Sequence, residues 1–184
     1  MQGMTLPEDP VDVLMAAWRA ELPDVLNHAS ELAKRIMVLS AALADATRRE
    51  LPEIGLTVGE FDVLVALRRA GPPYRMKPNQ LARSLMLSTG GTSNVTNRLV
   101  ERRLVAREAD PDDARGAWIR LTPDGVALAE RAVRVNSAAH AEVFDGVPVE
   151  VVDRAAAALR EVTAATARRA SRATARAPRA PSPT

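Results

Sequence analysis

The sequence contains no cysteine, only two histidines and 3% aromatic residues. The absence of cysteine excludes disulfide bonds, thiolate catalysis and zinc sites with cysteine ligands. Because His28 and His140 are too few for a histidine-rich metal site, we expect no metal and no cofactor. No apolar run approaches the roughly 20 residues of a membrane-spanning helix, and the N-terminus does not resemble a secretory signal. We therefore expect a cytoplasmic protein without membrane contact.

Catalytic motifs are missing as well. The sequence has no G-x-S-x-G elbow, no G-x-x-x-x-G-K-[ST] loop and no H-E-x-x-H motif. The carboxylates Asp110, Asp112 and Asp113 fall in a predicted surface turn, which is an exposed place for acid–base chemistry. We therefore do not expect an enzyme.

Charge is present but unevenly distributed. The net charge is only +2, although the sequence pI is about 9.6. Residues 75–120 carry 9 basic and 5 acidic residues, and residues 162–184 carry 5 arginines and no acid. The other two segments, 1–74 and 121–161, are acidic. A cationic segment attracts nucleic acid because phosphate neutralisation releases counterions, although a merely solvated basic face would have the same composition.

Apolar periodicity divides the chain into five parts. Hydrophobic residues recur every three or four positions at both ends of the chain, which predicts helices, with Pro23 breaking the first from a second over 24–51. The two termini are poor in large apolar residues and are predicted to be disordered. The expected parts are a disordered N-terminus (1–10), N-terminal helices (11–55), a DNA-binding domain (56–122), C-terminal helices (123–169) and an Arg/Pro tail (170–184).

The central part has the element order of a winged helix-turn-helix. Thr57 and Glu60 form a predicted capping box, Pro78 starts a short helix, and Ser88 or Thr89 starts the next. Two strand-like segments, LVARE and AWIRLT, are joined by the turn-rich DPDDARG, and Thr122 caps a further helix. This order predicts a mainly α fold with a small β-hairpin wing. In such folds the second helix of the pair enters the major groove of DNA.

At this point the residues resemble a known family, the MarR-type transcriptional regulators. The resemblance covers about residues 56–130, and its most specific part is DPDDARGAWIRLTPDG. The phrases LRRAGPPYR and WRAELPD are similar to the urate-responsive, PecS/HucR-like branch. The resemblance implies a homodimer, a pseudo-palindromic double-stranded operator and a small-molecule effector, most often acting on a repressor.

Two alternatives stay open beside this interpretation. The long terminal helices have more apolar face than one small lobe can cover, which favours a dimer, but they could also pack on each other in a monomer. A winged-helix protein-interaction module without DNA binding, an antagonist of a related regulator, is the alternative function. The basic segment 75–120 argues against it.

The predicted recognition helix separates into two faces. Thr92, Val95 and Leu99 should pack inward, so that Ser93, Asn94 and Asn97 face base edges, for which an asparagine amide is suited. Thr89 at the helix start can offer its N–H group to a phosphate. Arg98 and Arg102 are either phosphate anchors or partners of acids within the chain.

The predicted wing and the effector site complete the candidates. Arg115 should enter a narrow minor groove, oriented by Asp113, and Arg120 should hold a phosphate. The resemblance places Trp18, Asp62 and Arg107 in an effector pocket, although Trp18 could pack in a core and Asp62 could be a surface acid or pair with Arg107.

Two positions depart from the family pattern. Val95 stands where the urate-responsive branch has an arginine, so an apolar or phenolic aromatic ligand fits at least as well as urate. Arg103 stands where the family has a glycine ending the recognition helix. A side chain in the left-handed conformation costs about 1 kcal/mol.

Arg115→Ala is expected to weaken operator binding strongly and to leave the fold intact, because the substitution removes a wing-tip guanidinium from the minor groove. Binding is measured by fluorescence anisotropy at physiological salt, and folding by circular dichroism. Unchanged affinity would contradict this role.

Overall fold

The structure is a computed structural model that describes residues 9–85, 89–111 and 113–176, and all their side chains except those of residues 89–90, 113–115 and 170–176. The chain divides into two compact units, Met1–Val143 and Phe144–Thr184. The first unit carries six α-helices and a small sheet among its described residues, and the second carries one long helix. None of the helices in these described ranges is long and apolar enough to cross a membrane.

The N-terminal helices are α1 (Pro10–Glu21) and α2 (Ser30–Glu50), with a 3-10 turn, η1 (Pro23–Val25), between them. Asp9 caps α1, because its carboxylate accepts the N–H of Val11 at 2.8 Å. α2 begins at Ser30 rather than at residue 24 as expected from the sequence. The Asn27 side chain accepts the N–H of Ala29, and this local turn holds the chain out of the helix until Ser30.

The winged lobe contains α3 (Val58–Arg69), α4 (Pro78–Leu85) and α5 (Thr89–Glu101), preceded by the 3-10 turn η2 (Leu51–Ile54). The capping box is confirmed, since Thr57 Oγ1 accepts the N–H of Glu60, and Glu60 Oε2 accepts the N–H of Thr57 at 2.9 Å. The three helices close around one apolar core together with the sheet. Its fully buried side chains include Leu64, Leu67, Leu81, Leu99 and Ile119.

The wing is a three-stranded antiparallel sheet in the order β1-β3-β2. The strands are β1 (Arg75–Met76), β2 (Val105–Asp110) and β3 (Asp113–Leu121). β1 was not expected from the sequence, because two residues are too short for an alternating pattern. In the register of the hairpin, Arg107 lies opposite Ile119 and Glu108 lies opposite Trp118. Successive residues therefore point to opposite faces, one toward α5 and the other away from it.

The helix α6 (Pro123–Val143) leaves the wing through a tight junction. Thr122 Oγ1 accepts the N–H of Gly125 at 3.0 Å and donates to the carbonyl of Arg103 at 2.8 Å. Arg103 has a φ of 60°, so it adopts the left-handed conformation in spite of its Cβ. α6 then packs along α2, where the Thr47 hydroxyl lies 2.7 Å from Asn136 Oδ1.

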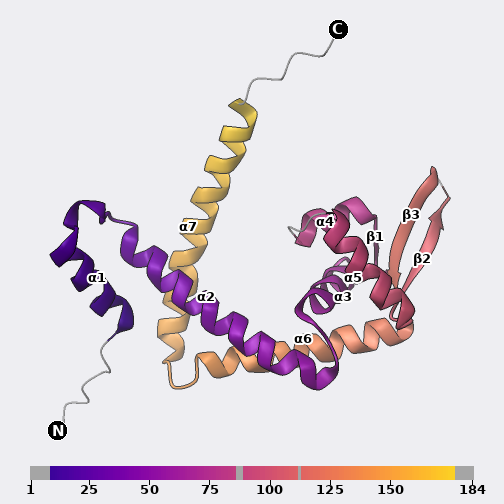
Figure 1. The fold of residues 1–184 in the computed structure, drawn as a ribbon, viewed down its shortest axis with the longest axis horizontal. Helices are drawn as coiled ribbons and strands as arrows, with labels where there is room; N and C mark the ends of the chain where they lie inside the picture. Colours follow the sequence, from indigo (N-terminus) through magenta and orange to yellow (C-terminus); the bar gives the residue numbers. More distant parts are fainter. Residues whose placement is uncertain (1–8, 86–88, 112, 177–184) are drawn as a thin grey trace. The chain divides into compact units, whose positions relative to one another are not determined.

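Figure 1 shows α1 at one end of α2 and the winged lobe at the other. The second unit contains α7 (Val149–Arg176). This helix ends seven residues beyond the expected end at Arg169, so the segment 170–176, predicted to belong to a disordered tail, is helical. Alanine is frequent in α7, and its high helix propensity accounts for the extension.

Gly125→Ala is expected to lower the free energy of unfolding by about 3 kcal/mol, at the upper end of overpacking costs. A Cβ at this position would lie 1.9 Å from the backbone oxygen of Leu104, which cannot move without shifting the end of the recognition helix. Chemical denaturation measures the change. Gly59→Ala is the control, because its Cβ would meet only the side chain of Val95 at 3.3 Å. Equal stability of the two variants would contradict the prediction.

Candidate nucleic-acid interface

The helix α5 buries one face and exposes the other. Thr92, Thr96 and Leu99 are buried, and Val95 is half-buried, so the inward face predicted from the sequence is found as expected. Thr96 Oγ1 donates to the carbonyl of Thr92 at 2.7 Å. This bond gives the buried hydroxyl group of Thr96 a hydrogen-bond partner. The side chains exposed on the outer face are those of Ser93, Asn94, Asn97 and Arg98.

Three predicted DNA-contacting side chains lie outside the described residues. The backbones of Asp113 and Arg115 belong to β3, and that of Thr89 begins α5. The orientation of these side chains is not described. Their roles at the wing and at the helix start therefore stay predictions from the sequence.

Arg98 lies on α5 and Arg102 follows the last residue of that helix, and the two arginines differ in their partners. Arg102 donates to Glu60 Oε1 at 3.0 Å, and this carboxylate is almost fully buried. Burial alone would raise the pKa of Glu60, but the hydrogen bonds from Thr57 and Arg102 outweigh it and lower the pKa. Arg98 is exposed and has no acid partner among the described residues. Arg102 is thus an intramolecular tie between α5 and α3, whereas Arg98 is available to an external anion.

Arg120 lies on the sheet face that points away from α5. Its Nε is 2.6 Å from Glu108 Oε1, so its charge is already opposed by an acid of the neighbouring strand. On the same face Arg75 stacks on the ring of Trp118, with 4.4 Å between the guanidinium carbon and the ring centroid. A phosphate contact by Arg120 would have to compete with Glu108, which the sequence did not indicate.

An ion pair between a half-exposed lysine and a buried carboxylate joins the wing to the start of α4. Lys77 Nζ lies 2.7 Å from Asp110 Oδ2, and the Asp110 side chain is 1% exposed. Lys77 also lies 5.2 Å from the centroid of the Trp118 ring. A buried carboxylate is costly without its counter-charge, so this pair favours a single position of the wing relative to the helix pair. No local sequence pattern indicates this pair, because the two residues are 33 positions apart.

The three residues assigned to an effector pocket do not meet within one chain. Trp18 lines a groove between α1 and α2, together with Met15 and Met37. Asp62 lies on α3, where burial raises the pKa of its carboxyl group. Arg107 lies on β2 and donates to Asn97 Oδ1 at 2.7 Å, and no ion pair to Asp62 occurs in the part of the chain that the structure describes. Arg107 therefore belongs spatially to the recognition helix.

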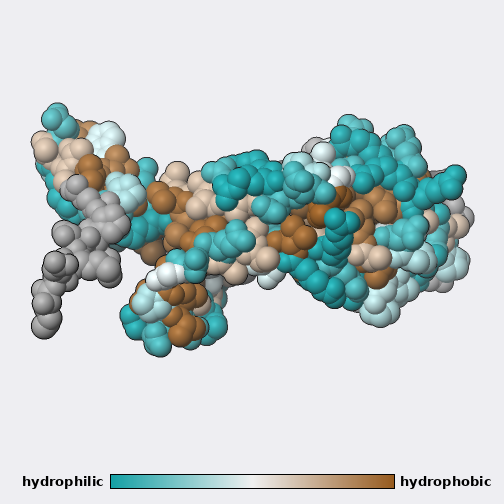
Figure 2. Space-filling model, turned by 90° about the horizontal axis from the view of Figure 1, so that it is seen from below, coloured by the Kyte–Doolittle hydropathy of each residue, from teal (hydrophilic) through white to brown (hydrophobic). Residues whose placement is uncertain are grey.

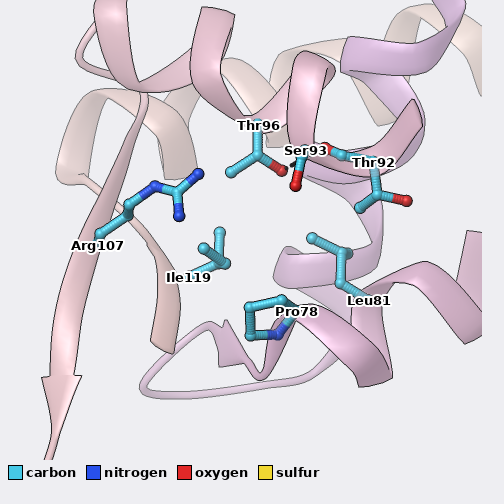
Figure 3. Close-up of a pocket in the computed structure, with 7 residues that line it drawn as sticks. All are labelled: Pro78, Leu81, Thr92, Ser93, Thr96, Arg107 and Ile119. Atoms are coloured by element: carbon cyan, nitrogen blue, oxygen red, sulfur yellow. Dashed lines mark hydrogen bonds between the residues drawn. The ribbon is translucent and has the colours of Figure 1, made fainter. Parts of the chain in front are cut away.

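Figure 3 shows Arg107 reaching from the wing strand toward the recognition helix above a small cavity. The cavity holds about 20 Å³, enough for a water molecule but not for an effector. Its walls come from α4, α5 and the sheet, and its lining residues are Pro78, Leu81, Thr92, Ser93, Thr96, Arg107 and Ile119.

A helix pair with an exposed polar second helix, followed by a hairpin wing, defines a winged helix-turn-helix DNA-binding protein. The MarR family matches residues 54–116, which include the helix pair and most of the wing. The transcriptional regulator PecS of Dickeya dadantii is 29% identical over 123 residues, or 67% of this chain and 74% of PecS. Over these residues the chain is similar to the MarR family of transcriptional regulators.

Solved structures share the fold. A mutant MarR from E. coli complexed with operator DNA superposes with a TM-score of 0.61 at 23% identity, covering 79% of this chain and 96% of that one. BpsR of Bordetella bronchiseptica, whose DNA binding is regulated by 6-hydroxynicotinic acid, has a TM-score of 0.61 at 25% identity and covers 72% and 98%. These relatives are regulators rather than enzymes, in agreement with the expectation from the sequence.

Arg98→Ala and Arg102→Ala are expected to act on different properties. Losing Arg98 should weaken the salt dependence of DNA binding. The slope of the logarithm of the association constant against the logarithm of the salt concentration should become less negative by about one for each lost phosphate contact. Losing Arg102 should instead cost about 1 kcal/mol of stability, because its partial exposure screens the pair.

The stability loss in Arg102→Ala should depend on pH. Since the pKa of Glu60 is lowered in the folded state, the stabilisation is present above the unfolded pKa and disappears as the pH falls through the folded pKa. Anisotropy titrations and thermal melts at several pH values measure both effects. A stability loss in Arg98→Ala, or a changed salt slope in Arg102→Ala without a stability loss, would contradict the assignment.

Proposed function

We propose that this chain forms a homodimer that binds a pseudo-palindromic operator and represses transcription until a small aromatic or phenolic ligand releases it. The observation that carries DNA binding is the outer face of α5, where Ser93, Asn94 and Asn97 are exposed beside Arg98. Small polar side chains can approach base edges closely, and the neighbouring cation has no acid partner among the described residues. Two such helices would read half-sites about one helical turn apart.

A dimer is supported by the apolar surface of α1 and α2. α2 has 21 residues, about 30 Å of helix, yet Ala46 is its only buried side chain. Large hydrophobic side chains are exposed along it, namely Leu32, Ile36, Met37, Val38 and Leu39. Figure 2 shows hydrophobic surface at the end of the molecule where α1 lies. A second copy is the simplest way to cover such a surface.

The effector proposal rests on the groove between α1 and α2 and on Asp62. The groove has a volume of about 370 Å³ and is lined largely by apolar side chains, including Trp18, Val25 and Leu26. That volume is in the range for small-molecule sites. Because Trp18 and Asp62 lie toward opposite ends of α2, a ligand that touches both would have to bind where two copies meet. It would act by binding one dimer conformation more tightly than another.

BpsR supports the ligand class, since 6-hydroxynicotinic acid is a small hydroxylated aromatic acid. In this chain Val95 occupies the position at which the urate-responsive branch has an arginine. A ligand with less negative charge, or a phenol able to hydrogen-bond to Asp62, is therefore preferred over urate.

A mobility shift with the DNA upstream of the chain's own gene tests the function. We expect a specific complex that survives competitor DNA and is released by a phenolic or polyketide-like compound, with urate less effective. Failure to form any specific complex would contradict DNA binding and would favour the protein-interaction module.

Ile36→Glu serves as the dimer control in the same experiment. A carboxylate in the middle of the apolar face of α2 should convert the dimer to a monomer in light scattering and abolish the complex. The exposed substitution Arg49→Glu, at the end of the same helix, should leave the dimer intact. A monomeric wild-type protein that still binds the full operator would overturn the dimer proposal.

A further inference from the structure

The hydrogen bond between Arg107 and Asn97 connects the wing to the exposed face of the recognition helix. The guanidinium of Arg107 donates to Asn97 Oδ1 at 2.7 Å, and both side chains are exposed. No acid of the described residues is paired with Arg107, in contrast to Arg120 and Glu108 on the other sheet face. The bond is thus made on the exposed face of α5 to which the proposed function assigns DNA binding, and the partner of Arg107 in it is a neutral amide.

The chemistry of the two groups fixes how the amide is oriented. A guanidinium has only donors, so the atom of Asn97 that faces it must be the carbonyl oxygen. The NH₂ group of the same amide then points away from Arg107. An asparagine that pairs bidentately with adenine needs its oxygen for the adenine N6–H₂ group and its NH₂ for N7. In this structure the oxygen is already engaged by the wing.

Both partners are held by buried parts of the lobe. Arg107 lies opposite Ile119 in the sheet, and Ile119 is 2% exposed in the core. On the helix side, the neighbouring Thr96 and Leu99 are also buried. Figure 3 shows the Arg107 side chain directed across the cavity toward the helix. The relative position of the two groups is therefore set by the packing of the core.

We propose that Arg107 and Asn97 form a donor-only unit that makes each half-site select guanine over adenine at one position. This proposal rests on the proposed function. The NH₂ of Asn97 and the remaining N–H groups of Arg107 offer two donors side by side. Guanine presents two acceptors, N7 and O6, in the major groove, whereas adenine presents N7 beside the N6–H₂ donor. Arg107 thereby determines specificity both directly and by positioning Asn97.

The full-length protein is tested by selection from a randomised duplex DNA library, followed by anisotropy titrations with the selected duplex and its guanine-to-adenine variants. For the wild type we expect about a tenfold preference for guanine at one position of each half-site. In Arg107→Ala the freed amide can pair bidentately with adenine, so the preference should reverse toward adenine. In the double variant Asn97→Ala/Arg107→Ala the adenine preference should disappear.

Arg98→Ala is the matched control, because it removes a neighbouring exposed cation from the same helix. It should weaken binding about equally to all duplexes and leave the base preference unchanged. Circular dichroism and thermal melts verify that every variant is folded, as expected for exposed side chains.

Several outcomes would overturn the proposal. One is a wild-type half-site without a selected guanine. Another is an Arg107→Ala variant that loses affinity uniformly with a reduced salt slope, which would make Arg107 a phosphate anchor only. A third is loss of the guanine preference without a gain for adenine, since Asn97 would then take no part. If the wild type enriches no sequence at all, the proposed function itself fails, and this result is distinguishable from the other three.

Discussion

The hydroxyl of Thr122 connects the end of the recognition helix to the start of α6. It donates to the carbonyl of Arg103, which ends the recognition helix, and it accepts the N–H of Gly125 in the first turn of α6. The backbone of Thr122 also donates to the Leu104 carbonyl at 3.1 Å. The recognition helix, the wing and α6 therefore meet within a few residues. These hydrogen bonds fix the first turn of α6 relative to the residues that follow α5.

The cations of the lobe divide by whether an acid opposes them. Arg102, Arg120 and Lys77 are paired with carboxylates, and each pair joins two elements of the lobe. Arg98 has no such partner in the described residues, and Arg107 is engaged only by a neutral amide. A charge balanced inside the protein contributes to the fold, whereas one that lacks an opposing acid retains its attraction for phosphates or base acceptors. The basic segment 75–120 thus offers fewer unopposed cations than its 9 basic residues suggest.

Local features of the sequence predicted the lobe well. The capping box of Thr57 and Glu60 and the inward face of α5 depend on neighbours within a few residues, and both are present. The strand β1 and the start of α2 were missed, the first because two residues carry no period, and the second because the turn at Asn27 replaces the first helical turns. The family resemblance assigned Arg107 to the effector site. Val105, two residues earlier on the same face of β2, is buried, which indicates that the Arg107 side chain is directed toward the helices.

The sequence by itself determined the fold class, most of the element order and the resemblance to the MarR family, because these follow from periodicity, caps and motifs that are local in the chain. Only the tertiary structure decided which charges are opposed and what each polar side chain faces. Lys77 and Asp110, Glu60 and Arg102, and Asn97 and Arg107 all pair across different elements. Such pairs form when packing of the apolar core brings the elements together. Side-chain orientation, and with it the reading of DNA, is therefore a property of the fold rather than of any one segment.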